Sequence, residues 1–306
     1  MNNQDYIEVD FRTLISILWK GRILIVGITA LFSVIAVLFS LSLPNIYRSE
    51  ALISVVEQGQ DSPLSGLSST FGGLASIAGI NLQAGSGSKR DIAIETLKSR
   101  TFISDFININ ELKPLLIGVE GWNAEKNELI YDSEVYDIEN NIWVREVSYP
   151  KTKTPSDLEA YRYLIKENLS ISEDEDTGFI RVSIKHYSPY IAKRILDSLI
   201  NSINNKLRMI DIEEANKSVV FLQSKLKETK NVDIRKIMFD MIEGQVQNQM
   251  LAEVRDEYVF KTIDPAIVDE IKFSPKRAIL SIMGAILGFF IAVFSLLVFF
   301  IYKRQK

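Results

Sequence analysis

The sequence predicts an α+β membrane protein in which two transmembrane helices flank an extracytoplasmic α/β base domain with a long, protruding antiparallel helical hairpin. Two observations lead to this fold class. Uncharged apolar runs stand near both ends of the 306-residue chain, and the sequence between them combines strand-like alternation with one long stretch of helical periodicity. The 47% hydrophobic content and the net charge of -4 fit neither a disordered chain nor a nucleic-acid-binding protein.

The two apolar runs cover residues 23–43 and 278–302, and neither contains a charged side chain. At a rise of about 1.5 Å per residue, each run reaches the roughly 30 Å needed to cross the hydrocarbon core of a bilayer. A cleavable signal peptide is the alternative for the first run. That run is longer than the apolar region of a signal peptide and ends without an Ala-x-Ala pattern, so we predict a retained anchor.

Charge near the membrane orients the chain. Two spans place both termini on one side, and the tails carry six cations near the membrane against four at the ends of the domain, a positive-inside bias. The absence of cysteine suits an export compartment. We therefore expect cytoplasmic tails at residues 1–22 and 303–306, with residues 44–277 outside the cytoplasm. The cations are Arg12, Lys20, Arg22, Lys303, Arg304 and Lys306 in the tails, and Arg48, Lys272, Lys276 and Arg277 in the domain.

The membrane interface has markers of its own. In the N-terminal tail, five apolar residues at helical spacing predict a short helix that lies in the interface. Aromatic rings prefer the headgroup region, which places Trp19 and Tyr302 on the cytoplasmic side and Tyr47 and Phe273 on the far side. The five apolar residues of the tail are Ile7, Phe11, Leu14, Ile15 and Leu18.

Strand and helix signals alternate through the base domain. Strand-like segments at residues 47–56 and 258–264 each adjoin a span, and we expect them to pair because both spans enter the same small patch of membrane. Ser156, with Glu159 three residues later, has the form of a capping box at a helix start. Alternation before and at His186 predicts a half-buried strand with this histidine on its apolar face.

The helical hairpin is predicted over about residues 188–255. Ser188 and Pro189 supply an N-cap and a first helical residue, and no proline or glycine follows until Gly244. One apolar stripe occupies the first part of this stretch, and after a pause a second stripe begins at Ile234. Two helices of this kind bury their stripes against each other, which gives an antiparallel pair.

Residues 59–88 are rich in glycine and serine, and we predict a mobile loop. The stretch "GSGSK" raises a phosphate-binding P-loop as the alternative. A P-loop requires Gly-x-x-x-x-Gly-Lys-Ser/Thr, and no glycine pair gives that spacing before Lys89.

The sequence contains no recognisable catalytic constellation. No cysteine is present to act as a nucleophile or a thiolate ligand, and the one histidine is assigned to a strand. Consecutive acidic residues at 173–176 suggest metal binding, but no EF-hand spacing follows, so we predict a solvated turn. We therefore expect a protein that is not an enzyme and that needs no cofactor or metal ion.

Specific roles are predicted at the start of the second apolar run. Pro275 ends the extended approach, and Lys276 and Arg277 anchor at the headgroups, so that the helix enters the bilayer at about Ala278. Two glycines four residues apart, with two more small residues beside them, then allow another helix to approach closely. The alternative is that the glycines only reflect the usual composition of membrane helices. The four small residues are Gly284, Gly288, Ser281 and Ala285.

Several blocks of the chain, taken in order, resemble the chain length determinant (Wzz-type) polysaccharide co-polymerases. The blocks are "IEVDFRTLISILWKGRILI", "GGLASIAGI", "AIETLKSRTFISDFI", "TGFIRVSIKHYSPYIAKRILDSLINSIN", "LAEVRDEYVFKTIDPA" and "SPKRAILSIMGAILG". Together they cover nearly the whole chain. Members of the family commonly have several prolines before the second span, whereas here only Pro265 and Pro275 stand in that segment.

The resemblance implies a bacterial inner-membrane protein with a periplasmic domain, assembled as a ring-like homo-oligomer. Such a protein would regulate O-antigen chain length in lipopolysaccharide biosynthesis, acting on a lipid-linked polysaccharide with a separate polymerase. The four residues after Tyr302 favour the short-tailed lipopolysaccharide branch over the related autokinases. Two alternatives are a capsule or exopolysaccharide export co-polymerase, which shares this architecture, and a two-span membrane sensor.

Overall fold

The computed structural model describes residues 18–56 and 85–305. Its contacts divide the chain into two units, Met1–Ile46 with Ile271–Lys306, and Tyr47–Glu270. Most of the predicted interfacial helix, and residues 59–84 of the predicted loop, lie outside the described residues. Residues 85–88, which the sequence analysis assigned to that loop, instead begin a helix.

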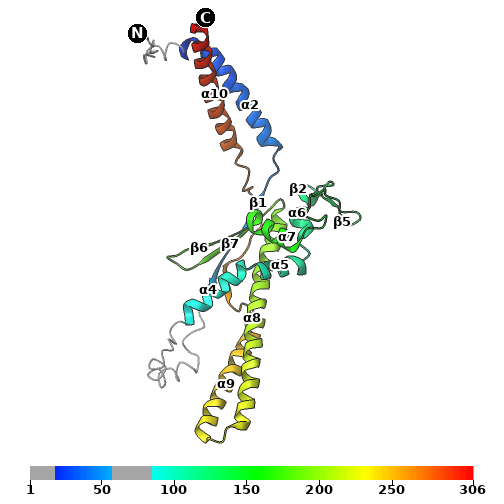
Figure 1. Ribbon diagram of the computed structural model, residues 1–306, viewed down its shortest axis with the longest axis vertical. Coiled ribbons are helices and arrows are strands. Elements are labelled where there is room, and N and C mark those ends of the chain that lie inside the picture. Colours follow the sequence, from blue (N-terminus) through cyan, green and yellow to red (C-terminus); the bar gives the residue numbers. More distant parts are fainter. Residues whose placement is uncertain (1–17, 57–84, 306) are drawn as a thin grey trace, which may run out of the picture. The chain divides into compact units, whose positions relative to one another are not determined.

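The first unit contains an antiparallel pair of apolar helices, α2 and α10 (Figure 1). Both are long and apolar enough to cross a membrane, with a mean hydropathy of 2.7. Their large side chains face outward, as at Leu38 and Phe290, which are 62% and 65% exposed, and such a surface suits lipid rather than water. Helix α2 spans Arg22–Ser42 and α10 spans Arg277–Gln305.

The second unit is built on a four-stranded antiparallel sheet with the order β6-β7-β1-β8. Strand β1 lies in the interior of the sheet and pairs with β7 on one side and β8 on the other. The predicted pairing of the strands that adjoin the two apolar runs is thus confirmed. The strands span Tyr47–Val55 (β1), Leu169–Glu173 (β6), Ile180–His186 (β7) and Phe260–Asp264 (β8).

The hydrophobic core lies between this sheet and the helices that cover it. Alternate residues of β7, Ile180, Val182 and Ile184, are fully buried, as the alternation predicts, and the first half of α8 packs on β1 and β7 with Ile195 and Leu199. Shorter helices complete the core. They are α4 (Gly85–Lys98), α5 (Arg100–Ile109), α6 (Lys113–Ile117) and α7 (Asp157–Tyr163), the last followed by the π-helix η2 (Leu164–Asn168).

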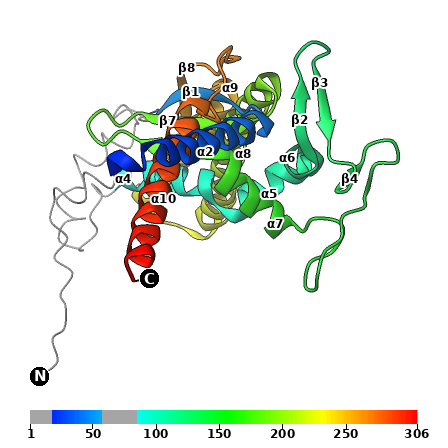
Figure 2. The same ribbon diagram turned by 90° about the horizontal axis from the view of Figure 1, so that it is seen from above.

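Two small β-hairpins form an arm at one side of this unit (Figure 2). Their strands are short and weakly alternating, so the hairpins were not predicted from the sequence. We refer to residues 119–143 as the arm. Its strands span Val119–Asn123 (β2), Glu128–Tyr131 (β3), Tyr136–Asp137 (β4) and Ile142–Trp143 (β5).

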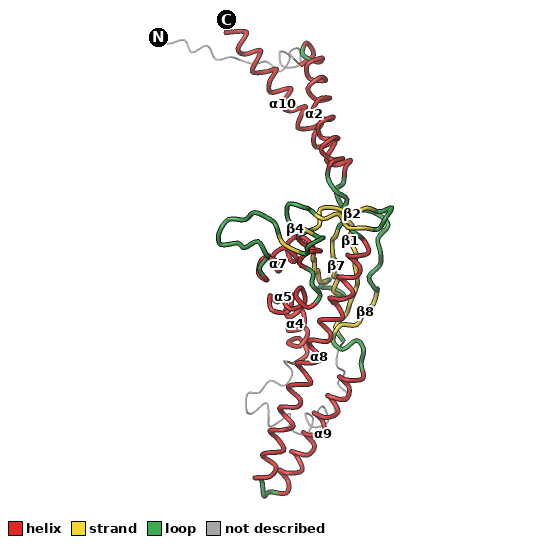
Figure 3. The backbone as a smooth tube through the Cα atoms, turned by 90° about the vertical axis from the view of Figure 1, so that its right-hand side faces the viewer, coloured by secondary structure: helices red, strands yellow, loops and turns green. Residues whose placement is uncertain are grey.

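Helices α8 and α9 lie side by side as an antiparallel pair that extends from the sheet (Figure 3). Helix α8 spans Pro189–Glu228 and, with 40 residues, is about 60 Å long. Its N-cap is Ser188, whose hydroxyl accepts a hydrogen bond from the amide of Ile191, as the sequence predicts. A short turn leads to α9, which spans Val232–Val254 and returns the chain to β8.

Candidate functional site

The predicted glycines of α10 lie against α2. A methyl group added to Gly284 would collide with the Cβ of Ala36, and one added to Gly288 would lie 2.6 Å from the Cβ of Phe32. The same atom on Gly288 would lie 3.3 Å from the Cα of Thr29. Only glycine at these two positions allows the helices to approach this closely.

The other residues singled out at the start of α10 take different roles. The Ser281 hydroxyl donates to the carbonyl oxygen of Arg277 at 2.9 Å, one turn back in its own helix, and Ala285 is half-buried. The Arg277 guanidinium also donates to Asn45 Oδ1 at 3.2 Å, while Lys276 is exposed and Pro275 half-buried. The helix itself begins at Arg277, and entry into the bilayer at about Ala278 stays a prediction.

The partner stripe on α2 was missed by the sequence analysis. Thr29, Phe32 and Ala36 recur at helical spacing and face the two glycines of α10. Gly21 is packed just as closely against Leu296, whereas Gly27 has nothing within 4 Å of the position that a methyl group would take. The sequence did contain a signal for this stripe, because the small residues Thr29 and Ala36 are seven positions apart and so lie on one face of the helix.

The surfaces of α8 and α9 are unusually apolar. Along α8, Met209, Val220 and Phe221 are between 60% and 67% exposed, and they line a shallow hollow on the helix. On α9, Met250 and Val254 are 60% and 81% exposed. Beyond the core of the domain, Ala215 on α8 and Gly244 on α9 are buried, and larger apolar residues of both helices are half-buried, among them Leu222, Leu226, Met238 and Ile242.

Asn204 fastens α8 to the edge strand β8. This side chain is 3% exposed, and its Nδ2 group donates to the carbonyl oxygen of Phe260 at 2.8 Å. Its Oδ1 accepts from the amides of Val259 and Phe260 at 3.0 and 2.8 Å. One buried amide therefore satisfies three backbone groups where the chain enters β8.

Two further polar side chains of α8 hold the chain that leaves α9. The Arg208 guanidinium donates to the carbonyl oxygens of Arg255 and Asp256 at 2.5 and 2.7 Å, so a cation lies at the C-terminal end of α9. One turn further on, the Tyr258 hydroxyl donates to Asp211 Oδ2 at 2.5 Å. We call Asn204, Arg208 and Asp211 the polar ladder.

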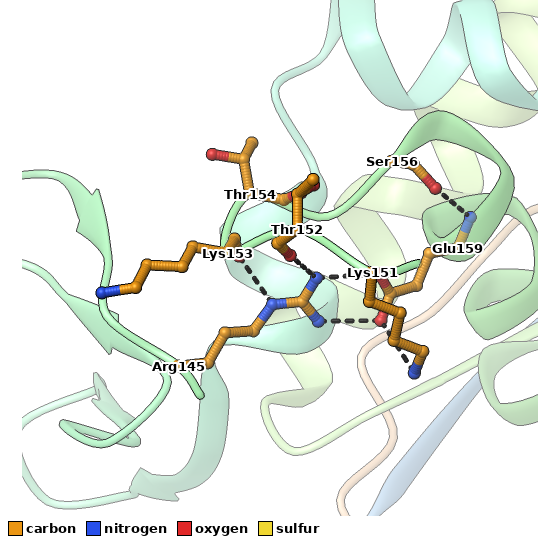
Figure 4. Close-up of polar contacts among 7 residues, drawn as sticks. All are labelled: Arg145, Lys151, Thr152, Lys153, Thr154, Ser156 and Glu159. Atoms are coloured by element: carbon orange, nitrogen blue, oxygen red, sulfur yellow. Dashed lines mark hydrogen bonds and ion pairs between the residues drawn. The ribbon is translucent and has the colours of Figure 1, made fainter. Parts of the chain in front are cut away.

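Arg145 forms hydrogen bonds that hold together the segment after the arm, residues 145–159 (Figure 4). Its guanidinium forms two hydrogen bonds with the Glu159 carboxylate, at 2.7 and 2.8 Å, and two more with the carbonyl oxygens of Thr152 and Lys153, at 2.9 and 2.6 Å. Arg145 is 8% exposed. Hydrogen bonds from Arg145 hold the pKa of Glu159 below its usual value, and Lys151 lies 3.4 Å from the same carboxylate.

The predicted capping box at the start of α7 forms only in part. The Ser156 hydroxyl accepts from the amide of Glu159 at 3.2 Å, as an N-cap does. The Glu159 side chain bonds Arg145 instead of an amide of the first turn, because the guanidinium offers a bidentate, charge-assisted partner.

His186 is buried and engaged at both ring nitrogens. Nε2 lies 2.9 Å from the carbonyl oxygen of Leu115, and Nδ1 accepts from the amide of Ser188 at 3.0 Å. Burial lowers the pKa of this imidazole, so the neutral form is favoured. Its place on the buried face of β7 confirms the structural role predicted for it.

The acidic turn after β6 is also accounted for by local contacts. Asp174 Oδ1 accepts from the amides of Asp176 and Thr177, both at 3.0 Å, and Glu173 pairs with Arg90. Among the described residues, no group of His, Cys, Asp or Glu side chains is arranged to hold a metal ion.

Residues 7–109 match the family model described as "Wzz: Chain length determinant protein". The match is confined to these residues, about a third of the 306-residue chain. The matched segment includes α2, β1 and α4 and ends with α5, at Ile109. It therefore joins the first apolar helix to the start of the sheet and to the core helices.

Comparisons with individual proteins show more distant similarity. Over 61 residues, 20% of this chain, the sequence is 41% identical to tyrosine-protein kinase etk of Escherichia coli strain K12, and the match covers 8% of that kinase. A solved structure described as a full-length bacterial polysaccharide co-polymerase aligns over 97% of this chain and 99% of its own, at 14% identity and a TM-score of 0.41. A fragment of WzzB, a polysaccharide co-polymerase from Salmonella Typhimurium, aligns over 75% of this chain and all of its own, at 13% identity and a TM-score of 0.30.

Proposed function

We propose that this protein regulates the length of O-antigen chains in lipopolysaccharide biosynthesis and forms no glycosidic bond itself. The Wzz match over residues 7–109 is the observation that carries the proposal. It covers the first apolar helix and the beginning of the base domain, so the matched segment holds both the membrane anchor and part of the domain that it anchors.

The protein would sit in the bacterial inner membrane as a two-span protein. Helices α2 and α10 would cross the bilayer, residues 44–277 would form the periplasmic domain, and the tails at 1–22 and 303–306 would be cytoplasmic. The outward-facing apolar side chains of both helices and the positive bias of the tails support this arrangement.

Several copies would assemble into a ring-like homo-oligomer that acts with a separate O-antigen polymerase on a lipid-linked polysaccharide. The exposed apolar side chains of α8 and α9 support self-association, because isolated surface residues of this size are normal but a continuous series along two helices is not. The glycine face of α10 would hold α2 of the same copy within the membrane.

A regulatory rather than catalytic role agrees with the chemistry of the described residues. The one histidine is buried with both nitrogens engaged, and the acidic turn bonds its own backbone. The match to etk is confined to 8% of that kinase and gives no reason to transfer its activity.

Electrophoresis of lipopolysaccharide tests the proposal. Deleting the gene should replace a clustered O-antigen ladder with a broad, short-biased distribution, and restoring it should bring the cluster back. Complete loss of polymer would show that the protein is required for synthesis itself. An unchanged ladder accompanied by loss of capsule or exopolysaccharide would favour an export co-polymerase.

A further inference from the structure

Three aromatic rings from different elements meet outside the hydrophobic core. Tyr47 at the start of β1 lies edge-on to Trp122 of β2, with ring centroids 5.6 Å apart, and Trp122 lies 6.1 Å from Tyr190 in the first turn of α8. None of the three belongs to the core cluster of the domain or to the side chains packed against it. We call these rings the aromatic triad.

The triad is partly open to its surroundings. Tyr190 is 51% exposed, and Tyr47 and Trp122 are half-buried. The indole nitrogen of Trp122 donates to Asn127 Oδ1 at 3.0 Å, so the polar edge of this ring points to an exposed turn. Rings with an apolar body and a satisfied polar edge are the side chains that favour a membrane interface.

The cationic side chain of Arg194 lies on the same helix as Tyr190. Arg194 follows Tyr190 by four residues in α8, so the two side chains share a face of the helix, and Arg194 is exposed. Burial raises the pKa of Tyr131 at the end of β3, and the charge of Arg194 opposes this rise, so the guanidinium lies near the arm. An exposed guanidinium next to amphipathic rings matches the phosphate groups of phospholipids.

Chain connectivity ties the triad to the ends of both apolar helices. Tyr47 is the fifth residue after Ser42, the last of α2, and five residues extend at most about 18 Å. The residue before Tyr47, Ile46, accepts a hydrogen bond from the amide of Phe273 at 2.8 Å and donates to Ser274 at 2.9 Å. Ser274 in turn precedes the start of α10 by three residues.

We propose that Tyr47, Trp122 and Tyr190, with Arg194, form a contact with the phospholipid headgroup layer. This inference rests on the proposed function, because it requires α2 and α10 to span a bilayer. The triad would then extend the membrane attachment beyond the two helices and fix how the domain rests on the lipid surface. The arm, through Trp122, would be held by the same contact.

Fluorescence quenching in the full chain tests the proposal. The sequence holds three tryptophans, Trp19, Trp122 and Trp143. Trp19→Phe with Trp143→Phe leaves Trp122 as the only one, in protein reconstituted into phosphatidylcholine vesicles. Phosphatidylcholine with a nitroxide on its headgroup should quench Trp122 emission, more steeply than lipid labelled at the end of its acyl chain.

Two companion variants provide the controls. A chain with only Trp143 should be quenched several-fold less by the headgroup label, because that ring packs on Tyr136 within the arm at 4.8 Å between centroids. A chain with only Trp19 should be quenched if the apolar helices span the bilayer. Trp143→Tyr can replace Trp143→Phe if the phenylalanine variant does not fold.

Each alternative result overturns the inference in a recognisable way. If Trp19 is quenched and Trp122 is not, the helices are embedded and only the lipid contact fails. If neither is quenched, the membrane assignment fails with it. If Trp122 emission depends on the protein-to-lipid ratio and not on the labelled lipid, a second copy of the chain covers the triad.

Discussion

The protein contains two antiparallel helix pairs that differ in packing and in surface. In α2–α10, Gly284 and Gly288 allow the two backbones to approach closely. In α8–α9, the small residues Ala215 and Gly244 are buried, and larger apolar side chains such as Leu222 are half-buried. Many other large apolar side chains of both pairs face outward.

The surfaces differ in their charges. No ion pair or charged side chain interrupts the apolar surface of α2 between Ile23 and Ser42, whereas charged residues alternate with apolar ones along α8. Lys217 pairs with Glu213 and Lys225 with Glu228 on the exposed side of that helix. The first surface suits lipid alone, while the second suits water in part and a protein partner in part.

The ends of the pairs differ as well. At the base of α8–α9, the polar ladder fixes the chain between α9 and β8 through hydrogen bonds to the backbone. At the end of α2–α10, Asn45 accepts hydrogen bonds from Lys272 and Arg277, and the backbone of Ile46 is bonded to Ser274. The base of the second pair is buried and specific, so it should be the more sensitive to substitution.

The largest effect is expected from breaking the polar ladder. Asn204→Leu would remove the side-chain partner of three backbone groups, two of them buried, each worth about 1–3 kcal/mol, so the domain should lose roughly 4 kcal/mol of stability. Thermal unfolding of the full chain in detergent measures this. Asn201→Leu, at an exposed position one turn earlier in α8, is the matched control. Equal melting temperatures for the two variants would contradict the role of the ladder.

The ion pair between Arg145 and Glu159 belongs to neither helix pair, so breaking it provides a reference for the stability losses. Arg145→Ala would leave Glu159 poorly compensated in a largely buried place and should cost about 3 kcal/mol, because removing one partner of a buried pair is strongly destabilising. Lys151→Ala removes a cation from the same carboxylate but is 61% exposed, and should cost under about 1 kcal/mol. Similar losses for both would mean that the bidentate contact adds nothing.

The apolar surface of the second pair should matter for association more than for folding. Val220→Ser with Phe221→Ser removes two side chains that are 67% and 60% exposed, so the free energy of unfolding of the monomer should change by under about 1 kcal/mol. Assembly in the membrane should weaken several-fold, as measured by chemical cross-linking. Unchanged cross-linking would show that α8 contributes no contact between copies.

Between pH 7 and 5, a pH effect on stability is expected from His186, just before α8. Because the pKa of His186 is lowered in the fold, the unfolded chain binds a proton first as pH falls below about 6.5. The contribution of neutral His186 to the free energy of unfolding should therefore be fully present above that pH. Below it, the free energy of unfolding should fall by at most about 1.4 kcal/mol per pH unit. His186→Gln should remove this slope between pH 7 and 5 in thermal unfolding. A slope that persists in the variant would assign it to other groups.

Part of this organisation was accessible from the sequence, because it depends on local signals. Uncharged length identified the two apolar helices, and the N-cap Ser188 marked the start of α8. The pairing of β1 with β8 followed from one long-range constraint, the common position of two chain ends. Gly284 and Gly288 were recognisable because their spacing alone places them on one helix face.

The features that were not predicted from the sequence depend on contacts between distant segments or on very short elements. Asn204 lies 56 residues from its partner Phe260 in the sequence, and nothing in the local pattern of α8 distinguishes it from Asn205. The choice of Arg145 as the partner of Glu159 likewise overrides the local capping signal. The two-residue strands β4 and β5 are too short for alternation to be visible.

The O-antigen ladder of a deletion strain carrying glycine variants tests the central claim most directly. Gly284→Leu with Gly288→Leu should overpack the α2–α10 contact, at a cost of about 2 kcal/mol, and leave a shortened or broadened distribution at normal protein levels. Gly27→Leu, where nothing lies within 4 Å, should restore the wild-type cluster. A normal ladder from the double variant, expressed as well as the Gly27 control, would contradict the proposal that this helix contact serves chain-length control.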